Sequence, residues 1–309
     1  MRRVSSRWHQ LVFLLICSLI QVKAEVLPNT VEKTLVQDAI SKGAVCLDGS
    51  PAAYHYDKGF GDGVNNWVVW LEGGGWCRSV EDCGHRLSYS NGSSNHMPNT
   101  RNFSGLLSNK KTYNPEFYNW HRIMIRYCDG SSYTGDVEAV DKNSSKMLPS
   151  SCTSRMSPAL CFFPQNLQQY IKTPLFILNS AYDSFQIPET VIPFADRADF
   201  VKHCKPDFNK CSSDQKNMLR DFGAEFVSAL PKSYSPSQRG MFINSCFIHC
   251  QTDYAFTWNS PVVLLNNKTI AKTFGDWFFE RDLTRETVKP QDLPQICRPL
   301  PQKAQAQGH

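Results

Sequence analysis

The segment WVVWLEGGGW, residues 67–76, joins a predicted strand to a loop of three glycines. The five apolar residues Trp67–Leu71 have the length and the β-branched and aromatic content of a buried strand. Gly73, Gly74 and Gly75 follow, and they are either an ordinary tight turn or an oxyanion hole. We favour the oxyanion hole, because backbone N–H groups approach a developing negative charge best where no Cβ intrudes. A strand directly before the loop is the context that such a hole needs.

Two later segments contain a candidate acid and a candidate base. FILNSAYD (176–183) ends in Asp183, and NSCFIHC (244–250) places His249 between Cys246 and Cys250. Taken alone, Asp183 could be a turn residue or a helix cap rather than a catalytic acid. Taken alone, His249 could be a packed residue in a loop held by disulfides rather than a catalytic base. The order glycine loop, Asp, His is nevertheless the chain order of the α/β hydrolases with the serine removed. In that interpretation Asp183 orients His249, and His249 is the general base.

The nucleophile of such a site is not found. A nucleophile elbow has two glycines four residues apart with Ser between them, because the turn leaves no room for side chains on either side. Among 17 glycines only Gly59 and Gly63 have this spacing, and Gly61 lies between them. Some serines near predicted strand ends are poor substitutes, since they lack the paired glycines or share a strand with Asp183 or His249: Ser131, Ser132, Ser180 and Ser245.

Short apolar runs between turn residues, together with helical patterns, predict an α/β fold. The predicted strands are Trp67–Leu71, Ile123–Tyr127, Leu175–Leu178, Met241–Ile243 and Pro261–Leu265. The predicted helices are Thr30–Lys42, Ser213–Ala229 and Ile270–Phe279. The Thr30 hydroxyl is a candidate cap for the first of them.

Residues 1–24 have the pattern of a secretory signal peptide. A basic start with Arg2, Arg3 and Arg7 precedes the apolar run Leu11–Ile20, which is too short to span a bilayer. Without this segment the chain has 29 basic and 28 acidic residues, so its net charge falls from +5 to +1. The charge therefore gives no support for a nucleic-acid partner, and no membrane contact is expected after cleavage.

Cysteine usage agrees with secretion. Eleven of the 12 cysteines lie after residue 24, and in an oxidising compartment they are expected to form disulfides. No C-x-x-C pair occurs, so we expect no metal site and no cofactor. The odd number leaves at least one thiol without an intrachain partner. The chain also has four N-glycosylation sequons: Asn91, Asn102, Asn143 and Asn267.

Five blocks closely resemble the plant pectin acetylesterases, a family related more distantly to the animal Notum-type lipid deacylases. In order, they are WVVWLEGGGWC (67–77), RYCDGSSYTGD (126–136), LPSSCTSRMSPALCFFPQ (148–165), PLFILNSAYDSFQI (174–187) and NSCFIHCQ (244–251). The resemblance implies an α/β-hydrolase-like fold with a mostly parallel sheet and flanking helices, over residues 25–287. A Pro/Gln-rich tail, 288–309, follows. It also implies a monomer that is secreted to the cell wall and removes acetyl groups from homogalacturonan, the acetylated backbone of pectin.

Residue by residue, the resemblance implies that Asp183 is the acid of the catalytic triad and His249 its base. The oxyanion loop corresponds to Gly73–Gly75, and Trp76 to an aromatic residue beside it that offers a platform for the sugar.

The chain departs from the family after Asp141. Family members continue through a helix into a strand and an elbow of the type S-G-C-S-A-G-G, whereas here KNSSKM leads directly into LPSSCTSRM. A βαβ unit takes about 30 residues or more, so the join 142–150 has no room for it. We expect a missing strand–elbow–helix unit, with two inner strand edges left unpaired. The expected consequence is impaired hydrolysis; the alternatives are an inactive pectin-binding or regulatory isoform, or a splice product that does not fold.

Overall fold

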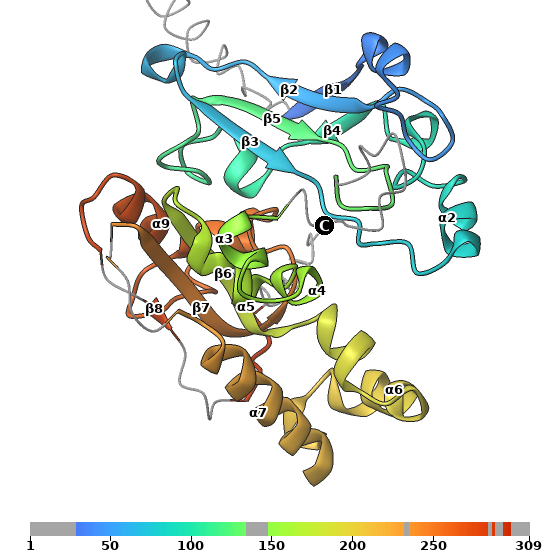
Figure 1. Ribbon diagram of the computed structural model, residues 1–309. Coiled ribbons are helices and arrows are strands. Elements are labelled where there is room, and N and C mark those ends of the chain that lie inside the picture. The colour runs from blue at the N-terminus through green and yellow to red at the C-terminus, as the bar shows by residue number, and fades with distance from the viewer. Residues whose placement is uncertain are drawn as a thin grey trace, which may run out of the picture.

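The computed structural model describes residues 29–133, 148–231, 235, 237–283, 286–287 and 293–297. The predicted signal peptide, most of the join after Asp141 and the Asn143 sequon lie outside the described residues. Figure 1 shows the described strands in two separate sheets, with five strands in the upper one and three in the lower one.

The five-stranded sheet has the order β3-β5-β2-β1-β4. Its strands are β1 (Thr30–Leu35), β2 (Ala53–Asp57), β3 (Trp67–Leu71), β4 (Thr100–Asn102) and β5 (His121–Ile125). Strand β3 lies at one edge and pairs with β5 in parallel, with Val69 opposite Ile123. The other pairings in this sheet are antiparallel.

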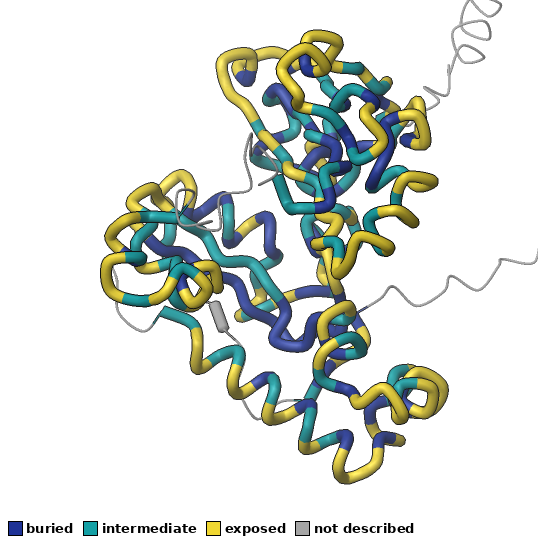
Figure 2. The backbone as a smooth tube through the Cα atoms, turned by 45° about the vertical axis from the view of Figure 1, so that its right-hand side comes forward, coloured by how far each residue is buried: buried dark blue, intermediate teal, exposed yellow. Residues whose placement is uncertain are grey.

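The three-stranded sheet has the order β6-β7-β8, and both of its pairings are parallel. Its strands are β6 (Leu175–Asp183), β7 (Arg239–Ile248) and β8 (Glu286–Thr287). Every residue of β7 is buried, and this strand is continuously dark blue in Figure 2. A central strand that is buried along its whole length is typical of parallel sheets that have helices on both faces.

Helices cover the two faces of this smaller sheet. Alternate residues of β7 point to opposite sides, so Met241 packs in the cluster that contains Leu219 of α7 (Ser213–Ser228). Phe242 packs on the other side, with Ile270 of α9 (Ile270–Phe278). The described residues thus form one mixed sheet and one parallel sheet with flanking helices. The glycine loop and His249 follow strands of parallel pairs, and Asp183 ends one.

The remaining α-helices are short. They are α2 (Val80–Arg86), α3 (Ser150–Thr153), α4 (Pro158–Cys161), α5 (Pro164–Leu167), α6 (Arg197–Asp199) and α8 (Ala255–Trp258). Short segments of 3₁₀-helix or π-helix connect several elements, among them η1 (Gln37–Lys42) and η4 (Gly105–Leu107). Among the described helices, none is long and apolar enough to cross a membrane.

Four predicted strands and two predicted helices are confirmed, although β6 and β7 each run five residues past the predicted end, and two segments differ. The predicted helix Thr30–Lys42 is wrong in its first half, because Thr30–Leu35 is strand β1, which pairs on both sides with β2 and β4. The Thr30 hydroxyl does not cap a helix; it donates to Asn102 Oδ1 on β4 at 2.8 Å. The predicted strand Pro261–Leu265 is a turn region with a single bridge at Leu265, and its Val263 fills the core beside α9.

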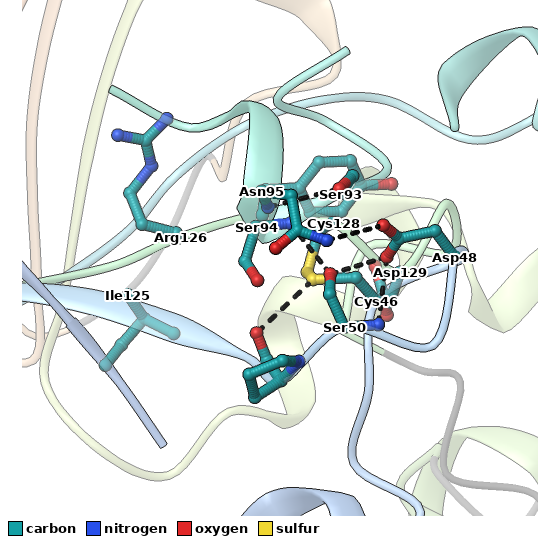
Figure 3. The surroundings of a disulfide bond; sticks show 12 residues. Cys46, Asp48, Ser50, Ser93, Ser94, Asn95, Ile125, Arg126, Cys128 and Asp129 are labelled. Carbon is teal, nitrogen blue, oxygen red and sulfur yellow. Dashed lines mark hydrogen bonds between the residues drawn. A yellow bond between two sulfur atoms is a disulfide. The ribbon is translucent and has the colours of Figure 1, made fainter. Parts of the chain in front are cut away.

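Five disulfides cross-link the fold: Cys46–Cys128, Cys77–Cys83, Cys152–Cys161, Cys204–Cys211 and Cys246–Cys297. The first spans 82 residues and lies beside the segment that contains Ser93, Ser94 and Asn95 (Figure 3). Closing so long a loop in the unfolded chain contributes roughly 4 kcal/mol of stability.

Candidate functional site

Asp183 and His249 form a direct hydrogen-bonded pair. Asp183 is the last residue of β6 and His249 follows β7, so the parallel pairing of these strands brings the two side chains to one edge of the sheet. His249 Nδ1 lies 2.7 Å from Asp183 Oδ2. The other carboxylate oxygen accepts backbone N–H bonds from Phe185 and Gln186 at 2.8 and 2.9 Å. The carboxylate is therefore held in place from both sides, as an orienting acid must be.

Burial and hydrogen bonding set the ionisation of the pair. Burial acts to raise the pKa of Asp183, but the bonds from His249 and from the backbone of Gln186 and Phe185 outweigh it and lower the pKa. The bond to Asp183, followed by one to the Cys250 side chain, raises the pKa of His249 to about 10. The side chain of His249 is 51% exposed, whereas that of Asp183 is 11% exposed. The His249 imidazole is thus accessible to solvent, and the Asp183 carboxylate behind it is shielded.

The glycine loop after β3 has a fixed shape. A Cβ on Gly74 would lie 1.7 Å from the Tyr127 ring, so only glycine fits there, and Gly75 has a φ of +67°. The Arg86 guanidinium donates to the carbonyls of Gly74, Gly75 and Trp76 at 3.1, 2.8 and 2.8 Å. These contacts occupy the carbonyl side of the loop, which is the arrangement that leaves amide groups for a ligand.

The glycine loop and the acid–base pair belong to different sheets. A cavity of about 570 Å³ opens at the loop and is lined by Gly73 and Gly74, but neither Asp183 nor His249 lines it. Trp76 is 46% exposed and packs edge-to-face on Phe162 at 5.5 Å. The structure therefore brings two of the predicted site residues together and places the others beside a separate cavity.

Cys250 is the one unpaired cysteine of the eleven after residue 24, all of which are described. The prediction that one thiol lacks an intrachain partner is confirmed. This thiol is exposed and directly follows His249, with a φ of +55°. The nearby Cys246–Cys297 disulfide ties the end of β7 to the segment that follows β8.

Several residues that shape the site are not marked by any local sequence pattern. Arg86 and Tyr127 hold the glycine loop, yet they lie 11 and 52 residues from Gly75 in the chain, and no local pattern marks them. Glu72 binds Arg126 Nε at 2.7 Å and the Tyr127 amide at 3.1 Å. Its place between a predicted strand and the glycines was the one available signal.

Asp253 connects the surroundings of the acid–base pair to the larger sheet. Its loop docks on η4, where Leu106 N–H donates to the Thr252 carbonyl at 2.9 Å. Burial raises the pKa of Asp253 to about 6, and its Oδ1 is buried without a hydrogen-bond partner. Within the described residues no group of three or more His, Cys, Asp or Glu side chains is arranged to hold a metal ion.

The protein has a mixed sheet and a parallel sheet with helices on both faces, and an Asp–His pair lies at the ends of adjacent parallel strands. These features define an α/β-hydrolase-like protein. The family model described as "Pectinacetylesterase" matches residues 24–147 and 140–299. The chain therefore belongs to the pectinacetylesterase family.

Curated relatives agree with this family. Pectin acetylesterase 7 of Arabidopsis thaliana is 37% identical over 343 aligned positions, which cover 80% of this chain and 87% of the relative. Pectin acetylesterase 11 of the same plant is 35% identical over 363 positions, covering 87% of this chain and 91% of the relative. The palmitoleoyl-protein carboxylesterase NOTUM of Mus musculus is 34% identical over 106 residues, covering 34% of this chain and 21% of that protein.

The two plant alignments are longer than this chain of 309 residues. Coverage of 80% corresponds to about 247 residues of this chain, so about 96 of the 343 positions lie opposite gaps in it. Coverage of 87% corresponds to about 269 residues of this chain, so about 94 of the 363 positions lie opposite gaps in it. The two matches to the family model meet at residues 140–147.

Proposed function

We propose that this protein is a secreted, cell-wall member of the family that binds acetylated homogalacturonan, and that its acetylesterase turnover is strongly impaired. The observation that best supports esterase chemistry is the 2.7 Å hydrogen bond between His249 Nδ1 and Asp183 Oδ2, at the ends of two parallel strands. The substrate comes from the family, since the printed names of the plant relatives identify them as pectin acetylesterases.

In a complete site of this kind, a serine hydroxyl attacks the acetyl carbonyl while His249 Nε2 takes its proton. Asp183 keeps His249 in the tautomer that exposes Nε2, and amides of Gly73–Gly75 stabilise the tetrahedral oxyanion. His249 then returns the proton to the sugar oxygen as that group leaves. Water releases acetate from the acyl-enzyme by the same sequence of proton transfers.

None of the four serines near the ends of the relevant strands is well suited to the first step. Ser180 is 1% exposed and its hydroxyl donates to the Cys246 carbonyl, and Ser245 is 7% exposed. Ser131 and Ser132 follow β5 on a loop without the paired glycines of an elbow. Without a serine nucleophile, His249 can still activate a water molecule to attack the ester. Triad enzymes that lack one member keep only ~10³–10⁴-fold acceleration over the uncatalysed reaction in water.

We further propose that the impairment comes from an internal segment that this chain lacks. Three observations support it: the 90 or so extra positions of each plant relative (about 96 and 94), the meeting of the two family matches at residues 140–147, and the positions of β3 and β6 at open sheet edges. A segment of that length has room for the strand, elbow and helix that residues 142–150 cannot hold. The unpaired thiol of Cys250 fits the same event if its partner lies in the segment.

The alternative is an inactive isoform that binds pectin, and a reinsertion experiment separates the two. We compare acetate release from acetylated pectin by the secreted chain and by a chimera that carries the extra segment of Arabidopsis pectin acetylesterase 7 between Asp141 and Ser150. The chimera is expected to be at least about 10³-fold faster and to react with a serine-directed phosphonate. Residual turnover of the unmodified chain that is lost in His249→Ala supports an impaired enzyme. Pectin binding with no turnover favours the inactive isoform.

The matched control is His203→Ala, which removes an exposed histidine that contacts Asp199 at the same 2.7 Å distance. It is expected to leave turnover of the chimera unchanged. If the unmodified chain releases acetate as fast as the chimera and is labelled by the phosphonate, a substitute nucleophile exists and the impairment is wrong. The absence of a cooperative melting transition would instead identify a non-folding product. The genomic sequence across codons 136–152 tests the missing segment directly.

A further inference from the structure

Three side chains at the end of the smaller sheet form a continuous row: Cys250, His249 and Asp183. His249 Nδ1 lies 2.7 Å from Asp183 Oδ2, and the imidazole is also hydrogen-bonded to the Cys250 side chain. A nucleophile, a base in contact with it and a group that orients the base are the members of a cysteine–histidine catalytic site. The chain therefore has a nucleophile beside its base, although this nucleophile is a thiol and not a serine.

The Cys250 thiol is open to a reactant. Cys250 is exposed and forms no disulfide, and the side chain of His249 is 51% exposed. The two residues lie in the turn between β7, which ends at Ile248, and α8, which begins at Ala255. Cys250 has a φ of +55°, in the left-handed region that residues other than glycine rarely adopt and that is enriched at functional sites. This turn thus presents a thiol and an imidazole side by side at the surface.

The charge of His249 suits a thiolate nucleophile. The pKa of His249 is raised to about 10, first by the bond to Asp183, then by the bond to Cys250 and by attraction to the negative charges of both residues. At pH 7 the imidazole of this chain is therefore protonated. A cysteine beside a protonated histidine reacts as its thiolate, which needs no base for the attack. Protonated His249 then has a proton ready for the group that leaves.

The amide that follows Cys250 has the position of an oxyanion donor. In α/β hydrolases one such donor is the backbone N–H of the residue after the nucleophile. That residue is Gln251 here, and its N–H donates to no backbone acceptor in the part of the chain that the structure describes. Gln251 is 5% exposed; its carbonyl accepts from Thr257 Oγ1 at 2.6 Å, and its side chain accepts from Asn244 Nδ2. The residue is thus held in place before a reactant arrives, as an oxyanion donor must be.

We propose that Cys250 is an acyl-accepting nucleophile: its thiolate attacks the carbonyl of a small, unhindered acetyl ester and retains the acetyl group as a thioester. His249 supplies the proton for the leaving alcohol, Asp183 orients His249, and the Gln251 amide stabilises the oxyanion. This activity goes beyond the proposed function, because it does not require the ester to belong to pectin. The two share only the Asp183–His249 pair.

The bonds and protons of this reaction balance. The thiolate sulfur forms a bond to the carbonyl carbon, the C–O bond of the ester breaks, and the alcohol leaves with the proton of His249. His249, now neutral, takes a proton from water, and the hydroxide attacks the thioester carbonyl. The C–S bond then breaks, so acetic acid is released and the thiolate and protonated His249 are restored.

The probe is p-nitrophenyl acetate, a neutral ester with a coloured leaving group, added to the secreted chain at pH 7. A burst of about one nitrophenolate per chain is expected, followed by slower turnover, because the thioester accumulates. Peptide mass spectrometry is expected to find an acetyl group on Cys250 that hydroxylamine removes.

The control for a merely exposed thiol is Ser228→Cys in the Cys250→Ser background, which puts a thiol on the exposed last residue of α7. Cys250 is expected to be acetylated at least about tenfold faster than this thiol at pH 7, since an isolated thiol is mostly protonated at that pH. His249→Ala and Asp183→Asn are expected to reduce the rate toward that of the control thiol. His203→Ala, which removes an exposed histidine elsewhere, is expected to leave the rate unchanged.

Acetylation of Cys250 at the rate of the control thiol, or at a rate unaffected by both His249→Ala and Asp183→Asn, overturns the proposal. A nitrophenolate burst that persists in Cys250→Ser also overturns it, because the acetyl group then resides elsewhere. Release of acetate from pectin is measured separately. Its absence together with a thioester on Cys250 overturns the pectin substrate and leaves this inference in place.

Discussion

Replacing Asp183 by Asn is expected to lower the pKa of His249 by about 1–2 units. The carboxylate lies 2.7 Å from His249 Nδ1, and this bond is the largest cause of a pKa raised to about 10. Two opposite unit charges about 4 Å apart attract by about 1 kcal/mol in water and about 4 kcal/mol at an effective dielectric of 20. Since the His249 side chain is 51% exposed, we expect the attraction between Asp183 and protonated His249 to lie in the lower half of this range. At 1.36 kcal/mol per pKa unit, this gives the expected decrease.

The assay is an NMR titration of the ¹⁵N-labelled imidazole between pH 5 and 11. Cys250→Ser provides a second variant, because the Cys250 side chain is the next cause of the raised pKa, and it is expected to give a smaller decrease. Asp199→Asn is the control, since it removes a carboxylate that contacts another histidine, His203, at the same distance. The control is expected to leave the His249 titration in place. An Asp183→Asn protein whose His249 titrates within about 0.3 units of the unmodified chain would refute the electrostatic reasoning.

The same pair makes stability and residual turnover depend on pH in a definite direction. Because the pKa of His249 is raised in the folded state, its contribution to stability is fully present below its unfolded value of about 6.5 and is lost as the pH rises through about 10. The difference in melting temperature between the unmodified chain and Asp183→Asn is therefore expected to shrink above pH 10. Water activation needs neutral His249, so any residual acetate release is expected to rise with pH up to the same value.

Three further outcomes are expected. One thiol of the mature secreted protein reacts with a disulfide reagent under native conditions, and none reacts in Cys250→Ser; a reactive thiol that persists in the variant would contradict the observed pairing. Gly74→Ala lowers the free energy of unfolding by about 1–3 kcal/mol in denaturant titrations, because its Cβ would clash with the Tyr127 ring, whereas Gly73→Ala meets nothing within 4 Å and is the control. Asp253→Asn is expected to raise the melting temperature at pH 8 but not at pH 4. Burial raises the pKa of Asp253 to about 6, so the folded state favours the protonated carboxyl group and loses stability when that group ionises at higher pH. Equal effects of the substitution at both pH values would exclude this cause.

The contact between Asp183 and His249 was predictable from the sequence because it rests on local patterns. An apolar run that ends in a polar residue places that residue at the end of a strand, and both Asp183 and His249 follow such runs. The first strand was missed because TVEKTL carries charged side chains and few apolar ones, and pairing with two neighbours decided its conformation. Pro261–Leu265 has the composition of a strand, but its apolar side chains cover the core from a turn.

The support of the glycine loop was not predictable, because it comes from distant parts of the chain. Arg86 reaches the loop from the end of α2, and Tyr127 reaches it from the end of β5. Neither position has a spacing or a composition that marks this role.

The two halves of the site depend on different sheets, which explains how one can persist without the other. The Asp183–His249 pair needs only the β6–β7 pairing and the disulfide that begins at Cys246, whereas the glycine loop needs β3, β5 and Arg86. Strands β3 and β6 each lie at a sheet edge, and an unpaired edge exposes backbone groups that another strand can bind. In the proposed complete protein, the missing segment pairs with these edges and carries the nucleophile to the glycine loop and His249. The proposed loss of that segment removes the nucleophile but leaves the contact between Asp183 and His249 intact. In the described structure, the hydrogen bonds that hold these two side chains all come from the smaller sheet and its adjoining loops.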